Sequence, residues 1–333
     1  MDEEKKLYPF RFCRMEDTYN WGSEEFCLAD LGYRDSLVRD GWLAANSMSE
    51  IMDMYMDRVV GGNVFEYWGR QFPVCVRVVD VKGRMPLRVH PDDAMASERY
   101  DFLGKEKIWY VLSAGKDAGV MLGFRKDTDA AEVYSGCLDG SIGDILNVVA
   151  PHPGQCFHIA PGTPHAAFGS MTIVEISESS PLDFCLCGWD EEVSTEEFDE
   201  SLNLTDALEF IDYKRYKAAP DLDEALVDLP QFHVSRVDLK DALLSRSGEY
   251  DSFILYFCTE GEARIRMDIS GVETVYPVRS REAVLVPAEC PDFYIEPVQA
   301  GTSLLEVTIP FRTDTDKYIN PAAQEKLPDE EED

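Results

Sequence analysis

The sequence predicts an all-β protein made of two β domains, with only a few short helices. Three observations lead to this prediction. Short strand-like runs of apolar residues recur along the chain, Gly and Pro separate them at spacings typical of a sandwich or barrel, and helical signals are few. The length of 333 residues exceeds what one ordinary compact core needs, which favours two domains.

Strands are expected in two groups. Phe72–Val81 alternates, with Val74, Val76 and Val78 on one side of the strand. The other strands expected in the first group are 108–113, 120–124, 156–160 and 172–177. The pattern returns after about residue 230, over 252–258, 263–269, 283–287 and 303–309.

Helices are expected at three places. Ser47 and Glu50 form a capping-box pattern ahead of a segment with helical spacing that ends at Gly61-Gly62. A second capping box begins at Ser194, and residues 205–210 are typical of a short helix. We therefore expect an N-terminal domain over 1–190, a partly helical connector over 191–230, and a C-terminal domain over 231–333 that ends in an acidic disordered tail.

The charge balance excludes several classes of partner. Lys and Arg number 31 against 64 Asp and Glu, a net charge of −33, which disfavours nucleic acid and anionic membrane surfaces.

The start of the chain lacks the pattern of a signal peptide, and the uncharged run 145–174 is broken by prolines and glycines. The nine cysteines have no regular spacing, which favours a reducing cytoplasm. The sequence does not indicate an oligomeric state.

Three segments carry residues suited to chemistry: Pro86–Asp93, Gly104–Tyr110 and Gly154–Ala166. The third fits the second cupin motif, in which a glycine-containing turn precedes a histidine. Such a turn aims His165 into a jelly-roll barrel, where it can meet a histidine from another strand.

At these segments the sequence resembles the class I mannose-6-phosphate isomerases, over nearly the whole chain. The matching motifs are Asn20-Trp21-Gly22, Phe72-Pro73, Val89-His90-Pro91-Asp92, Gly104-Lys105, Trp109-Tyr110, Gly162-Thr163-Pro164-His165-Ala166 and Val174-Glu175-Ile176. The resemblance implies two cupin (jelly-roll) barrels. It also implies interconversion of mannose 6-phosphate and fructose 6-phosphate through an enediol, with one zinc in the first barrel.

The family's functional positions are only partly retained in this chain. Its four zinc-ligand positions carry Arg88, His90, Lys107 and His165 here. The position of the family's phosphate-binding serine is Pro86, and that of its catalytic arginine is Cys185. Lys105 and Glu175 are retained, and the resemblance implies that both are catalytic.

Two of these replacements argue against a metal. Arginine has no lone pair to offer, and lysine could bind zinc only after losing its proton. His90 and His165 alone make a weak zinc site, for which Glu175 or His158 could supply a third ligand. Glu106 should face away from the site unless the strand is bulged. We therefore expect less than stoichiometric zinc and no other cofactor.

The same replacements suggest an anion site. Arg88, Lys105 and Lys107 would make a cationic pocket suited to a phosphorylated sugar or another small anion. In the alternative, Arg88 and Lys107 pair with Glu175, Glu106 or Asp92 and fill the pocket. Three functions follow: a diverged, weakly active isomerase-like protein, an active zinc isomerase with a rearranged ligand set, or a non-catalytic regulatory or scaffold cupin. The second β domain lacks a metal-binding pattern and is expected to be structural.

Overall fold

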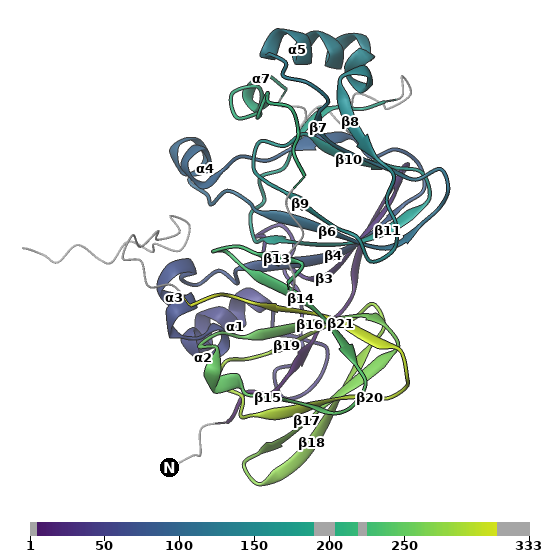
Figure 1. Ribbon diagram of the computed structural model, residues 1–333. Coiled ribbons are helices and arrows are strands. Elements are labelled where there is room, and N and C mark those ends of the chain that lie inside the picture. Colours follow the sequence, from purple (N-terminus) through teal and green to yellow (C-terminus); the bar gives the residue numbers. More distant parts are fainter. Residues whose placement is uncertain (1–4, 190–203, 219–224, 312–333) are drawn as a thin grey trace, which may run out of the picture. The chain divides into compact units, whose positions relative to one another are not determined.

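The computed structural model describes residues 5–189, 204–218 and 225–311, and the chain folds into two compact units (Figure 1). Unit 1 comprises residues 1–15, 26–76 and 221–333, and unit 2 comprises 16–25 and 77–220. The capping box at Ser194 and the acidic tail lie outside the described residues. The domain boundaries drawn from the sequence stay predictions.

Unit 2 is built around two antiparallel sheets. Its five-stranded sheet has the order β12 (Phe184–Cys187), β5 (Leu87–Val89), β10 (His165–Phe168), β7 (Gly119–Phe124) and β8 (Leu146–Val149). The six-stranded sheet has the order β2 (Met15–Tyr19), β3 (Gly22–Leu28), β4 (Val74–Val81), β11 (Met171–Glu178), β6 (Lys107–Ala114) and β9 (Cys156–Ile159). The residues of β2, β3 and β4 are divided between the two units. Side chains from both sheets, such as Leu122 and Val111, form one buried core between them.

Unit 1 repeats this plan. One sheet has the order β1 (Phe10–Arg11), β19 (Ala283–Val286), β16 (Ile254–Glu260), β21 (Thr302–Thr308), β14 (His233–Leu239) and β13 (Val227–Asp228). The other has the order β15 (Leu243–Ser245), β20 (Phe293–Pro297), β17 (Glu262–Ile269) and β18 (Val272–Arg279). Tyr256, Leu304 and Phe293 belong to the core that joins them.

Helices are short and few among the described residues. They are α1 (Met48–Tyr55), α2 (Asp57–Val60), α3 (Gly62–Trp68), α4 (Asp93–Tyr100), α5 (Ala130–Asp139) and α7 (Leu204–Ala207), with 3-10 turns at Ser141–Asp144 and Ser247–Glu249. The predicted capping box is present, since Ser47 and Glu50 cap α1 reciprocally. Met56 then breaks the expected helix with a φ of 46°.

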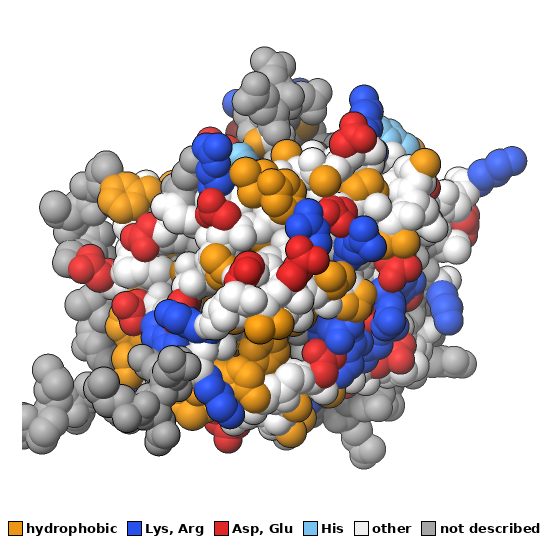
Figure 2. Space-filling model, turned by 90° about the horizontal axis from the view of Figure 1, so that it is seen from below, with side chains coloured by type: hydrophobic (Ala, Val, Ile, Leu, Met, Phe, Trp, Pro, Cys, Tyr) orange, Lys and Arg blue, Asp and Glu red, His pale blue; other side chains and the backbone are white. Residues whose placement is uncertain are grey.

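The all-β prediction is confirmed, and the expected strands are found within a few residues of their predicted bounds. Figure 2 shows one face of the molecule, on which basic and acidic side chains lie next to each other with apolar side chains between them. Among the described residues, Arg264 pairs with Glu296 and Arg266 pairs with Glu273. None of the helices in the described parts of the chain combines the length and apolar character needed to cross a bilayer.

Candidate active site

The fold brings His90 and His165 together at one place in unit 2. His165 begins β10 and lies opposite Arg88 of β5, and His90 follows directly after β5. The two imidazole ring centroids are 5.3 Å apart. The turn before His165 is tied to the other histidine, because the backbone N of Gly162 donates to the carbonyl oxygen of His90 at 2.8 Å. Gly162 has a φ of +77°, and a Cβ there would come within 2.6 Å of the Phe210 carbonyl oxygen, so this turn requires glycine.

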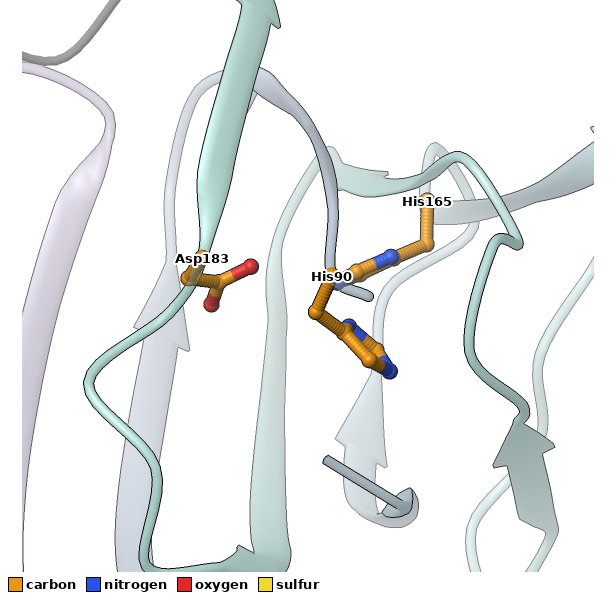
Figure 3. Close-up of side chains that lie close together, drawn as sticks. All are labelled: His90, His165 and Asp183. Carbon is orange, nitrogen blue, oxygen red and sulfur yellow. The ribbon is translucent and has the colours of Figure 1, made fainter. Parts of the chain in front are cut away.

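Asp183 joins the two histidines. In β12, Phe184 and Cys185 lie opposite Val89 and Arg88, and continuing this register places Asp183 beside His90. Ligand atoms of His90, His165 and Asp183 all lie within 4.8 Å of one another, with the carboxylate directed towards His90 (Figure 3). Sequence reasoning missed Asp183, because no motif marks a residue in the loop ahead of a short strand.

The two residues expected to supply a third ligand have other partners. Glu175 Oε2 accepts a hydrogen bond from Trp109 Nε1 at 2.6 Å. His158 Nε2 lies 2.7 Å from Glu106 Oε2, so Glu106 is engaged there as well. The oxygen ligand that the structure brings to the histidines is therefore Asp183.

Lys107 places its ammonium group within this cluster. Its Nζ donates to Asp183 Oδ2 at 3.0 Å, lies 3.2 Å from His165 Nε2 and lies 3.6 Å from Glu175 Oε2. The side chain is 1% exposed. A buried ammonium with two carboxylates and an imidazole around it meets its need for acceptors within the protein.

Arg88 is also paired, through residues that sequence reasoning missed. Its Nη1 donates to Glu24 Oε1 at 3.2 Å. Arg77 Nη1 donates to the other oxygen of Glu24 at 2.9 Å, and its Nε donates to Glu175 Oε1 at 2.8 Å. A signal for Arg77 was present, since a charged residue inside the apolar run of β4 needs a buried partner.

Unlike the other three cations of this cluster, Lys105 has no ion-pair partner among the described residues. Its side chain is 5% exposed, and it makes no hydrogen bond or ion pair with the residues that the structure describes. Its backbone N donates to the Pro91 carbonyl oxygen, an approach that Gly104 permits because a Cβ there would lie 2.3 Å from the Asp92 carbonyl carbon. Burial lowers the pKa of Lys105 to about 8, against the attraction of Asp183.

The electrostatics of the cluster leave a small positive excess. Arg77, Arg88, Lys105 and Lys107 face three carboxylates, those of Glu24, Glu175 and Asp183. Burial and then Lys107 hold the pKa of His90 well below its ordinary value and lower that of His165 to about 3, so both imidazoles are neutral at pH 7. Burial would raise the pKa of Glu175, but Arg77 and Lys107 bring it to about 2. The cluster therefore carries one net positive charge.

The donor set can be tested against a metal ion. Both ring nitrogens of His90 are buried without a hydrogen-bond partner. His165 Nδ1 lies 2.9 Å from the Thr163 carbonyl oxygen, which assigns the proton to Nδ1 and leaves the Nε2 lone pair facing Lys107. Two neutral imidazoles and a carboxylate suit zinc. The Lys107 ammonium, however, already meets His165 and Asp183, so the group does not fit a metal while that lysine stays protonated in place.

Comparisons with known proteins find similar chains among the mannose-6-phosphate isomerases. No family model matches the chain. Mannose-6-phosphate isomerase ManA of Bacillus subtilis is 26% identical over 303 residues, covering 83% of this chain and 92% of that protein. Mannose-6-phosphate isomerase of Streptococcus mutans is 29% identical over 119 residues, covering 36% and 37% of the two chains.

Solved structures share the fold. The mannose 6-phosphate isomerase structure from Bacillus subtilis superposes with a TM-score of 0.77 at 18% identity, covering 90% of this chain and 99% of the other. A zinc-bound structure of mannose 6-phosphate isomerase superposes with a TM-score of 0.68 at 14% identity, covering 91% and 99%.

Proposed function

We propose that this chain, a distant member of the mannose-6-phosphate isomerase family, binds a small phosphorylated sugar without a metal and isomerises it weakly or not at all. The position of the Lys107 ammonium supports this most directly. It lies 3.0 Å from Asp183 Oδ2 and 3.2 Å from His165 Nε2. It therefore supplies there the positive charge that a metal ion would supply. We also expect the protein to act in the cytoplasm.

Lys105 is the residue best suited to hold an anion. Arg88 and Lys107 are paired with Glu24 and Asp183, whereas Lys105 has no partner among the described residues. Arg88 is 19% exposed in its side chain, so it can add a second contact without leaving Glu24. A phosphate would give the buried ammonium of Lys105 the counter-charge that it otherwise lacks.

Cys185 argues against efficient turnover. The resemblance implies that an arginine stands at this position in active relatives. Burial raises the pKa of the Cys185 thiol to about 12, so this side chain is neutral at pH 7. A neutral thiol cannot replace the positive charge of a guanidinium beside a reacting sugar.

One observation favours a second candidate, a zinc isomerase with a rearranged ligand set. His90 has two buried ring nitrogens without partners, next to His165 and Asp183. Those three residues would hold the ion, and zinc would polarise the sugar carbonyl when bound. This candidate requires Lys107 to leave its two closest partners.

Titration with mannose 6-phosphate tests the proposed function. Changing Lys105 to Met should weaken binding of mannose 6-phosphate by about 10-fold to 100-fold, as expected for one charge-assisted contact of ~1.5–3 kcal/mol. Binding by the unmodified protein should also weaken as the pH rises past about 8, because the lysine loses its proton there. Isothermal titration calorimetry in the presence of a chelator measures both effects.

The matched control is Lys126 to Met, which removes an exposed lysine of unit 2 that is paired with Glu132. It should leave the affinity within about twofold. Equal weakening by the two variants, or no binding of mannose 6-phosphate by the unmodified chain, would contradict the assignment of Lys105.

A further inference from the structure

Unit 1 contains a pocket of about 320 Å³ that the proposed function does not use. Its lining comes from β14, β15, the segment that follows β15, and β21, whose strands are labelled in Figure 1. Its lining residues are Val237, Leu243, Leu244, Ser245, Arg246, Tyr250 and Glu306. This volume is at the lower end of the range of small-molecule sites, which suits a small ligand.

Glu306 is the unusual residue of this pocket. It lies on β21 opposite Tyr256 of β16, and Tyr256 belongs to the core between the two sheets, so both side chains point into the sandwich. The Tyr256 hydroxyl donates to Glu306 Oε2 at 2.7 Å. No cation of the described residues forms an ion pair with Glu306. An inward carboxylate that lacks a cation is unfavourable unless further donors approach it.

Tyr256 determines which carboxylate oxygen of Glu306 is left for a ligand. Burial, together with the charge of Glu306, raises the pKa of Tyr256 well above its ordinary value, so the phenol stays protonated and remains a donor. Glu306 Oε2 is therefore occupied by that hydrogen bond, and Oε1 is the oxygen available to a ligand. The pocket thus has one positioned acceptor among its lining residues.

The other polar residues of the pocket are all donors, and the hydroxyls of Ser245 and Tyr250 can also accept. Ser245 is buried, and its hydroxyl lies near that of Tyr256 without a well-formed hydrogen bond. Tyr250 and Arg246 also line the pocket, and Val237, Leu243 and Leu244 give it apolar walls. An ammonium ligand needs acceptors only, whereas sugar hydroxyls both donate and accept and leave C–H faces for apolar walls.

We propose that this pocket binds an unphosphorylated monosaccharide, with Glu306 Oε1 accepting hydrogen bonds from the sugar hydroxyls and Ser245 adding a further contact. The sequence had suggested a purely structural role for this domain. The inference rests on unit 1 alone and does not depend on the site around Lys107.

Ligand-observed NMR with the full chain tests the proposal, using D-mannose, D-glucose and n-butylamine as probes. At least one of the two sugars should bind with millimolar affinity. Changing Glu306 to Gln should weaken it at least tenfold, because the amide keeps the side-chain shape but loses the charge. Changing Leu244 to Trp should also weaken binding by filling the pocket, and Leu244 is exposed enough to accept the larger side chain.

A matched variant separates this site from the one in unit 2. Lys105 to Met should leave binding of the unphosphorylated sugar within twofold, while Glu306 to Gln should leave binding of mannose 6-phosphate within twofold. Thermal melting checks that each variant is folded. Absence of sugar binding, unchanged affinity in both pocket variants, or tighter binding of n-butylamine than of either sugar would overturn the proposal.

Discussion

Replacing Lys107 by alanine is expected to lower the free energy of unfolding by about 3–5 kcal/mol. The ammonium is 1% exposed and is the closest cation to Asp183, at 3.0 Å. Its removal leaves that carboxylate with Arg77, 3.6 Å away, as its remaining ion-pair partner among the described residues. Breaking a buried pair on one side is far more destabilising than losing an exposed pair, because the remaining charge cannot return to water. Urea unfolding in the presence of a chelator measures the difference.

Lys126 to Ala is the control for this experiment. Lys126 pairs with Glu132 at the surface, with side chains 66% and 39% exposed, and its loss should change the stability by less than about 1 kcal/mol. If Lys107 to Ala were as mild as this control, the ammonium would not be the charge that balances Asp183. A second variant, Lys107 to Ala with Asp183 to Asn, should recover part of the lost stability.

The second large effect is the gain of a metal site. Changing Arg88 to Gln and Lys107 to Glu together removes two cations and adds a carboxylate beside His90, His165 and Asp183. Glu24 keeps Arg77 as its partner after this change. The variant should therefore bind zinc, and zinc at 1,000 times its Kd should add about 4 kcal/mol of stability. For a chain of this size that corresponds to a Tm increase of roughly 6 °C.

Differential scanning calorimetry with and without zinc measures this gain. A third substitution in the double variant, His165→Ala, should abolish the zinc-dependent increase in Tm, because one of the two imidazole ligands is then missing. A folded double variant whose Tm does not respond to zinc would show that the ligand set has been placed wrongly. Isomerase turnover should stay low even with zinc bound, because Cys185 is unchanged.

Much of the fold could be predicted from the sequence. Strands such as β4 and β16 are marked by short, mostly apolar runs typical of a buried strand. The capping box at Ser47 correctly predicted where α1 begins, because that signal is local. The helical segment ends at Gly61 as predicted, but Met56, with a φ of 46°, divides it into α1 and α2, which no local pattern indicated.

The site was predictable where a motif fixes the geometry. The glycine turn before His165 and the Val89-His90-Pro91-Asp92 motif identified both histidines, which the structure places next to each other. Asp183, Glu24 and Arg77 were missed because their roles depend on pairing between strands far apart in the sequence. The sequence could show that Lys107 replaces a ligand, but not that Asp183 would be there to accept a hydrogen bond from its ammonium group.

The zinc content of the unmodified protein tests most directly whether Lys107 takes the place of the metal. The protein would be saturated with zinc, dialysed against metal-free buffer and measured by inductively coupled plasma mass spectrometry. We predict well below one zinc per chain, and no change on replacing His90 or His165 by alanine. One retained zinc per chain that is lost in both histidine variants would contradict the assignment of Lys107 to the metal position.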